Sequence, residues 1–273
     1  MLIIGLGEAG NNIAELFKEH KQYHVEQLDA GKGLKSFENP EEYDEIIYKP
    51  RKKVIKSATE GILFVCGSGK VSGATLRILE ALMHVRMTVV YICPDLEYSS
   101  HDEQLRHKVH YNILQEYARS GMISELLLLD NKTLIDLLGH GTIYNYFTKV
   151  NHYVYSAIHT LNYCKNVKAE FGKLHSPKNI SRITTLGYGT LEKNEEKMFF
   201  PLDNITETSY IININEEELI NDISILPNVK AMAKETKDLG RETSFAIWST
   251  EEAESYYYTK HYTHFIQEIE KEE

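Results

Sequence analysis

The sequence has few cysteines and no long apolar run, and both shortages exclude whole classes of protein. The three cysteines, Cys66, Cys93 and Cys164, show no CxxC spacing, which argues against a disulfide framework or a structural zinc site and for a reducing compartment. No apolar run approaches the ~18–20 residues that span a bilayer, and the N-terminal MLIIGLG lacks the basic region of a signal peptide. We therefore expect a cytoplasmic protein that does not enter a membrane.

Basic side chains are outnumbered by acidic ones. The 273 residues include 30 Lys and Arg against 40 Asp and Glu, which gives a formal net charge of −10. A protein that covers nucleic-acid phosphates needs a basic face, and this balance does not favour one. Because 42% of the residues are hydrophobic, the chain can bury a substantial core in one large domain or two small ones. The composition predicts a globular protein with no direct nucleic-acid contact.

Apolar runs alternate with helical periodicity through the first half of the chain. Strands are expected at residues 1–4, 24–28, 61–66, 87–93 and 125–129, with helices after Gly10 and at 74–84 and 102–120. The charged stretch 35–56 is expected to be a surface connection with one short strand. Strands that alternate with helices form a parallel sheet covered on both faces, and ligands bind at the carboxyl ends of its strands. The predicted fold class is α/β with a Rossmann-like parallel-sheet domain.

Glycines gather in a first loop between an expected strand and a helix. Gly5, Gly7 and Gly10 occupy this loop, and Asp29 lies at the end of the next expected strand. The pattern matches the dinucleotide-binding fingerprint, in which the acid takes the ribose hydroxyls and the glycines admit phosphate. The same glycines would also allow tight packing of strand against helix without any ligand.

A second glycine loop follows the expected strand at 61–66. It reads Gly67-Ser-Gly-Lys-Val-Ser-Gly73 and resembles part of a P-loop, but Phe64 and Val71 break the Walker pattern at its two ends. Two glycine loops after neighbouring strands could grip a polyphosphate from both sides, with Lys70 as an additional cation. One dinucleotide fold does not require this second loop.

Both loops resemble those of the tubulin/FtsZ superfamily of filament-forming GTP-binding proteins. Segment 7–13, GEAGNNI, is similar to the family's first loop, usually GQAGNQI, and segment 67–73 is similar to its signature loop, usually GGGTGTG. Segments 88–94 and 127–131 extend the resemblance, which covers roughly residues 1–190. It implies a divergent member of phage or plasmid type with a GTP-binding domain, a long central helix and a smaller mixed α+β C-terminal domain.

The resemblance implies a site for GTP or GDP, with Mg²⁺ on the phosphates. Phe147 and Asn151 stand where family members carry an aromatic that stacks on guanine and a polar side chain that reads its edge. Residues i and i+4 share a helix face, and Asn131 offers a second amide. Core packing of Phe147 and solvation of Asn151 remain the alternative. The candidate phosphate residues are Gly7, Glu8, Gly10, Asn12, Gly67, Ser68, Gly69, Lys70, Ser72 and Gly73.

Segment 168–174 resembles the acidic loop that completes the active site of the neighbouring subunit in this family. Glu170 stands at its first acidic position and Lys173 at its second. The resemblance implies head-to-tail self-assembly into filaments, with Glu170 and Lys173 at the catalytic positions. Because Lys173 replaces a carboxylate, GTP hydrolysis is expected to be slow or impaired, and whether the chain is an active GTPase stays open. An adaptor or a second tubulin-like subunit could co-assemble.

The expected organisation is a nucleotide-binding domain at 1–141, a central helix at 142–166, an interface loop at 167–177, a small domain at 178–262 and an acidic tail at 263–273. Two histidine pairs, His107 with His110 and His261 with His264, have i, i+3 spacing but no carboxylate or cysteine pattern beside them. We expect these to be surface histidines and assign them no metal-ligand role. The alternative functions are an NAD(P)-dependent Rossmann oxidoreductase and a nucleotide-free structural relative.

Overall fold

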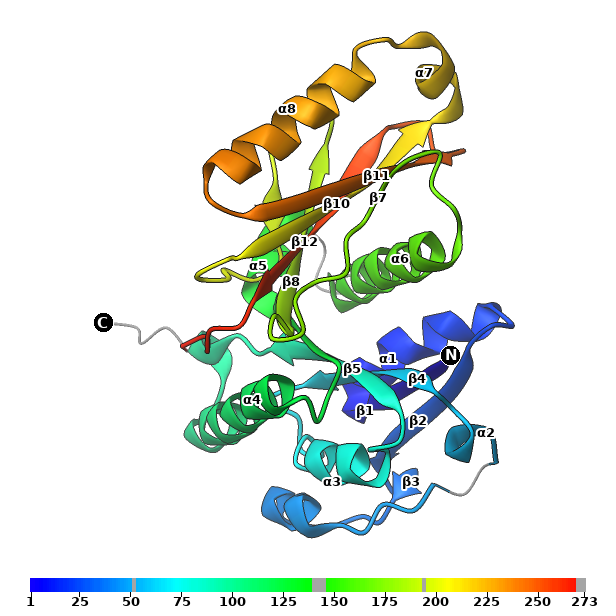
Figure 1. The fold of residues 1–273 in the computed structure, drawn as a ribbon. Coiled ribbons are helices and arrows are strands. Elements are labelled where there is room, and N and C mark those ends of the chain that lie inside the picture. Colours follow the sequence, from blue (N-terminus) through cyan, green and yellow to red (C-terminus); the bar gives the residue numbers. More distant parts are fainter. Residues whose placement is uncertain (51–52, 139–145, 193–194, 269–273) are drawn as a thin grey trace. The chain divides into compact units, whose positions relative to one another are not determined.

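The computed structural model describes residues 1–50, 53–138, 146–192 and 195–268, drawn in colour in Figure 1. Contacts divide the chain into two compact units, one comprising Met1–Ser156 with Ile266–Glu273 and the other Ala157–Phe265. The division falls inside the long helix α6 (Tyr146–Asn166). The predicted start of this helix at residue 142 lies outside the described residues, and the predicted domain boundaries stay predictions.

A parallel sheet forms the centre of the first unit, in the strand order β3-β2-β1-β4-β5-β6. Each neighbouring pair is parallel. Strands β1, β4, β5 and β6 are almost continuously buried, as expected where helices cover both faces of a parallel sheet. The α/β class with a parallel sheet is confirmed. The strands are β1 Leu2–Leu6, β2 His24–Ala30, β3 Gly33–Leu34, β4 Glu60–Cys66, β5 Arg86–Cys93 and β6 Glu125–Asp130.

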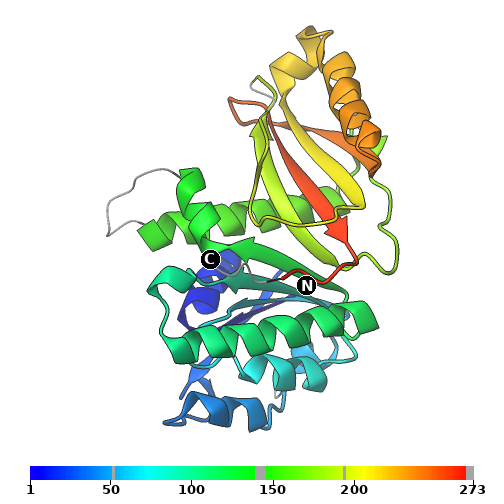
Figure 2. The same cartoon turned by 90° about the vertical axis from the view of Figure 1, so that its left-hand side faces the viewer.

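Helices cover both faces of this sheet. Figures 1 and 2 show α1 on one face and α3 with α4 on the other. The longest of these, α4, begins with a capping box between Ser100 and Glu103 and ends at Gly121, whose backbone is left-handed. The helical elements are α1 Gly7–Leu16, η1 Phe17–Glu19, η2 Pro40–Glu45, α2 Lys53–Lys56, α3 Ala74–Ala81, η3 Leu96–Tyr98, α4 His101–Ser120 and α5 Asn131–Leu138.

The stretch at 35–56 is packed more tightly than the sequence predicts. Its described residues, 35–50 and 53–56, form the short helices η2 and α2 and no strand, since β3 ends at Leu34. Tyr43 within η2 is 0% exposed, and the Asp44 carbonyl accepts a hydrogen bond from Arg77 Nε on α3 at 2.8 Å. The expectation of a surface connection is therefore wrong at Tyr43, which joins the core, while Glu41, Glu42 and Glu45 of η2 remain exposed.

The second unit has a mixed sheet in the order β8-β12-β10-β11-β7, with β9 paired to β8. Only β10 and β11 are parallel among these described pairs. Helix α8 lies along one face (Figure 1), where its apolar side packs on β10, β11 and β12. The predicted mixed α+β unit is confirmed. Its elements are β7 Phe171–Lys173, β8 Ile183–Thr190, β9 Lys197–Met198, β10 Glu207–Asn215, α7 Glu216–Asn221, α8 Ile225–Asp238, β11 Glu242–Thr250 and β12 Tyr256–Thr263.

Two predicted irregular segments are ordered in the structure. The interface loop at 167–177 contains β7, which pairs with the edge of β11. The tail at 263–273 starts within β12 and includes Gln267, which is 2% exposed. The Gln115 side chain pairs with the backbone of Gln267, accepting from its N–H at 2.7 Å and donating to its carbonyl at 3.1 Å. The expected acidic tail is thus packed against α4 at Gln267, and residues 269–273 lie outside the described residues.

Across the described ranges, no helix is both long enough and apolar enough to cross a membrane.

Candidate functional site

The first glycine loop is a direct passage from β1 into α1. Leu6 is extended, and Gly7 has a φ of +71°, a left-handed conformation that favours glycine. The chain therefore turns into the helix within one residue of the strand end. The first N–H groups of a helix have no intrahelical acceptor, so the start of α1 presents donors at the carboxyl edge of the sheet.

Two glycines beside this turn are needed for packing. A Cβ on Gly10 would lie 2.3 Å from the Phe64 carbonyl oxygen of β4, and one on Gly5 would lie 2.5 Å from the Gly10 carbonyl oxygen. Neither position has room for a side chain. The packing interpretation therefore accounts for Gly5 and Gly10, while Gly7 is required by its backbone conformation.

The second glycine loop, 67–73, joins β4 to α3 as a series of tight turns. Gly69 N–H donates to Cys66 O at 3.2 Å, and Ser72 N–H donates to Gly69 O at 3.0 Å. Among the described residues, no acceptor pairs with the N–H groups of Ser68, Lys70 or Val71. Unpaired N–H groups that follow one another in a turn form an anion-binding arrangement.

The structure brings the two loops into contact. A Cβ built on Gly7 would lie 3.1 Å from Val71 Cγ2, and Val71 is 3% exposed. The valine, which stands where the resembled family usually has glycine, therefore packs on the first loop. Because β1 and β4 are adjacent parallel strands, the donors of both loops lie at the same edge of the sheet.

The predicted phosphate residues of the second loop fall into two groups. Ser68 and Gly69 are half-buried, and Lys70 is exposed. Gly67, Ser72 and Gly73 are instead packed inside: a Cβ on Gly67 would lie 2.1 Å from Tyr91 Oη, and one on Gly73 would lie 1.8 Å from Asp44 Oδ1. Ser72 is 1% exposed. Ser68, Gly69 and Lys70 are therefore the members of this loop that an incoming anion can reach.

A buried polar cluster lies behind the second loop and corrects one prediction. His107 and His110 are 3% and 2% exposed, so they are not surface histidines. Tyr91 Oη lies 2.9 Å from His107 Nδ1. Burial, and secondarily the neighbouring His110, lowers the pKa of His107 to about 4. The described residues contain no group of three metal-ligating side chains.

The predicted base-binding residues are positioned by two helices. Asn131 begins α5 directly after β6, where the Asp130 carboxylate fixes the turn by accepting from Thr133 N–H at 2.8 Å. Phe147 in the first turn of α6 is 64% exposed, so it is not a core residue. Asn151 follows one helical turn later and is half-buried.

The remaining candidates on α1 and β2 are less enclosed. Glu8 and Asn12 are exposed on α1. Asp29, the acid of the dinucleotide fingerprint, is bound into a local turn, since its Oδ1 accepts from Ala30 N–H at 2.8 Å and its backbone N–H donates to Lys32 O at 2.7 Å. The hydrogen bonds of Asp29 therefore stabilise the turn between β2 and β3.

Glu170 and Lys173 belong to the second unit and are both exposed. Glu170 N–H donates to Ile247 O at 2.8 Å, and Lys173 pairs with Phe245 in the ladder between β7 and β11. A Cβ on Gly172, whose φ is +78°, would lie 2.5 Å from Phe245 O. The backbone of this segment is thus fixed to the sheet while both charged side chains face solvent.

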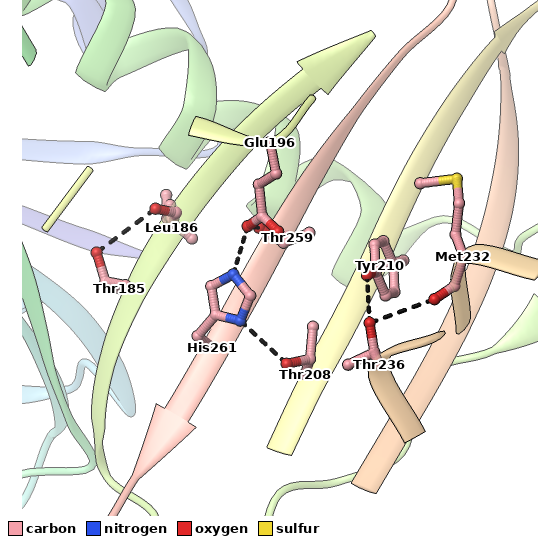
Figure 3. A network of polar contacts seen from close by, with 9 residues as sticks. All are labelled: Thr185, Leu186, Glu196, Thr208, Tyr210, Met232, Thr236, Thr259 and His261. Carbon is pink, nitrogen blue, oxygen red and sulfur yellow. Dashed lines mark hydrogen bonds and ion pairs between the residues drawn. The ribbon is translucent and has the colours of Figure 1, made fainter. Parts of the chain in front are cut away.

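His261 was also expected at the surface and is instead 2% exposed. Figure 3 shows it between Thr208, whose Oγ1 lies 3.0 Å from Nδ1, and Glu196, which bonds to Nε2. Burial alone would raise the pKa of Glu196, but hydrogen bonds from His261 and Thr259 outweigh it and hold that pKa below the usual 4.5. The network attaches the segment before β9 to the sheet.

No protein-family model and no curated protein sequence matches the chain. Solved structures match it well. A GTPγS-form protofilament of TubZ from Bacillus thuringiensis serovar israelensis has a TM-score of 0.70 at 15% identity, covering 95% of this chain and 85% of that one. An empty FtsZ dimer from M. jannaschii gives 0.68 at 11%, covering 96% and 87%. CetZ from Methanosaeta thermophila gives 0.64 at 13%, covering 97% and 86%. The chain therefore has the tubulin/FtsZ fold that its two glycine loops predicted.

Proposed function

We propose that the protein binds GTP and GDP at the carboxyl edge of the first unit's sheet and assembles head to tail into filaments. The observation that carries the proposal is the contact between the two glycine loops, Gly7 against Val71, within a chain that has the tubulin/FtsZ fold. Two donor-bearing loops at one edge suit a polyphosphate better than a single dinucleotide fingerprint does.

The phosphates would be held mainly by backbone groups. The unpaired N–H groups of Ser68, Lys70 and Val71 and the N-terminus of α1 supply donors, and the exposed ammonium of Lys70 adds positive charge. Mg²⁺ would bind chiefly to phosphate oxygens and water, which is its usual arrangement at nucleotides.

The guanine base would lie on α6. The exposed ring of Phe147 offers a stacking face, and Asn151 one turn later offers both a donor and an acceptor to the base edge. Asn131 at the end of β6 lies at the same edge of the sheet as the glycine loops. An amide that pairs with guanine would be mismatched with adenine, so we expect selectivity for guanine nucleotides.

Self-assembly is supported by the neighbours, since the TubZ structure is a protofilament and the FtsZ structure a dimer. A heterologous contact that does not close produces a filament. Glu170, just before β7, and Lys173, at the end of β7, are both exposed and would face the nucleotide of the next subunit. The lysine cannot act as a general base there, so hydrolysis would be slow. A cytoplasmic setting and a co-assembling adaptor or second tubulin-like subunit complete the proposal.

The nucleotide itself tests the proposal. Protein purified without added nucleotide should release GDP or GTP on denaturation, identified by chromatography against standards. Adding GTP should then raise light scattering above a critical protein concentration, with filaments visible by negative-stain microscopy. Release of NAD would favour the oxidoreductase alternative. Absence of any nucleotide and of any assembly would favour the nucleotide-free structural relative.

A further inference from the structure

Three hydrogen-bonded side chains connect the second glycine loop to the short helix η2. Ser72 Oγ lies 3.3 Å from His110 Nδ1, and His110 Nε2 lies 3.2 Å from Asp44 Oδ1. The three residues come from the loop, from α4 and from η2. Ser72 and His110 are 1% and 2% exposed, whereas the Asp44 side chain is 46% exposed. This series of hydrogen bonds thus runs from the partly exposed Asp44 to Ser72, which is buried at the base of the loop.

The positions of the hydrogens in this series of hydrogen bonds follow from the protonation states of His110 and Asp44. Burial lowers the pKa of His110 below its usual 6.5, and the opposing effect of Asp44 is smaller, so the imidazole is neutral at pH 7. A carboxylate can only accept, so His110 Nε2 carries the hydrogen and donates to Asp44. His110 Nδ1 then accepts from the Ser72 hydroxyl. Ser72 therefore spends its only hydroxyl hydrogen on His110 and has none for a phosphate.

Ser72 is the residue on which the turns of the loop depend. Its N–H donates to Gly69 O at 3.0 Å, and its carbonyl accepts from Thr75 N–H at 3.0 Å. Fixing Ser72 therefore fixes the turn that contains the unpaired N–H groups of Lys70 and Val71. Asp44 adds a second restraint, because its carboxylate fills the space beside Gly73.

We propose that His110 and Asp44 are positioning residues for phosphate binding, which they serve by holding Ser72 so that the N–H groups of the second loop converge on the anion. Neither side chain touches the phosphate in this account. The inference rests on the proposed nucleotide site and adds to it a role for η2, which the sequence predicts to be a surface connection.

The test compares Asp44→Ala with Asp44→Asn. Both variants remove the carboxylate charge, but the asparagine Oδ1 can still accept from His110 Nε2. Asp44→Ala should weaken GTP binding about fivefold to tenfold relative to Asp44→Asn, as expected for one lost hydrogen bond, and leave guanosine binding unchanged. Hydrogen exchange of the Ser72 and Thr75 amides should be faster in Asp44→Ala alone. Asp102→Ala, in the exposed first turn of α4, is the control and should match wild type.

A second comparison asks whether Ser72 and Asp44 affect phosphate binding through the same hydrogen-bonded unit. Ser72→Ala combined with Asp44→Ala should weaken GTP binding no more than the stronger single variant. Equal GTP affinities for Asp44→Ala and Asp44→Asn, a parallel loss of guanosine binding, or additive effects in the double variant would each overturn the inference while the proposed function stands. Absence of GTP binding by wild-type protein would overturn the proposed function and this inference with it.

Discussion

Val71 Cγ2 lies where it would be only 3.1 Å from a Cβ on Gly7, so the second loop packs directly on the turn of the first. The backbone of Gly7 is also left-handed, with φ at +71°, which favours glycine at this position. The two loops thus form one surface at the edge of the sheet. Val71 takes the place of a glycine usual in the resembled family, and the contact gives that departure a structural purpose.

The glycines of the site should differ sharply in their tolerance of alanine. Gly10→Ala would force a methyl to 2.3 Å from Phe64 O, whereas Gly69→Ala would place one 3.3 Å from Cys66 O. We expect Gly10→Ala to lower the free energy of unfolding by roughly 1–3 kcal/mol, the usual cost of overpacking, and Gly69→Ala to lower it by much less. Urea unfolding followed by circular dichroism measures both. Equal losses would show that Gly10 is not packed against β4.

Stability should fall in mild acid because His107 is buried in its neutral form. Its pKa is about 4 when folded against a usual 6.5, so between these values the unfolded chain binds a proton that the folded chain does not. The free energy of unfolding should therefore decrease by roughly 2 kcal/mol from pH 7 to pH 5 through this residue. His107→Gln should have a shallower pH dependence over this range, with a residual slope from His110, whose pKa is also lowered. An unchanged slope in the variant would contradict the assignment.

Charge reversal at Glu170 should separate assembly from nucleotide binding. The Glu170 side chain is exposed, and Glu170→Arg retains the backbone N–H that donates to Ile247 O. Glu170→Arg should therefore fold normally and bind GTP like wild type, but fail to scatter light, because a reversed charge at an interface opposes association. Glu235→Arg, an exposed change on α8, provides the matched control. Normal assembly of Glu170→Arg would place the interface elsewhere.

Lys173 should limit hydrolysis within filaments. A positioned carboxylate that orients the attacking water supplies ~10²–10⁴-fold in rate, and the exposed ammonium on β7 cannot do so. Lys173→Asp should raise phosphate release per assembled subunit by about 10²-fold and shorten filament lifetime. The measurement is a phosphate-release assay above the critical concentration. Brisk hydrolysis by wild type that Lys173→Asp leaves unchanged would assign the catalytic role to Glu170 or to another residue.

The sequence predicted the parallel sheet because its signals are local. The apolar runs of β1, β4 and β6 and the glycines after β1 and β4 can each be recognised within ten residues. The resemblance of those same loops carried the prediction of the fold. Site residues such as Asn131, Phe147 and Asn151 followed from that resemblance and not from any pattern of their own.

The burial of the polar residues could not be predicted in this way, because it depends on partners distant in sequence. His110 bonds to Ser72 and Asp44, and His261 bonds to Thr208 and Glu196. The spacing of the histidines in the sequence does not indicate these contacts. Similarly, the charged residues of η2 predict a surface segment, because the sequence does not indicate that η2 packs on α3.

Calorimetric titration with GTP, ATP and NAD tests the central claim most directly. The account predicts tight binding of GTP, with ATP and NAD much weaker, and a loss of roughly 1–3 kcal/mol of GTP binding in Asn151→Ala, since the variant would leave the guanine edge unpaired. His152→Ala, an exposed neighbour on α6, should bind as wild type does. Tighter binding of NAD than of GTP, or equal binding of GTP and ATP, would contradict the account.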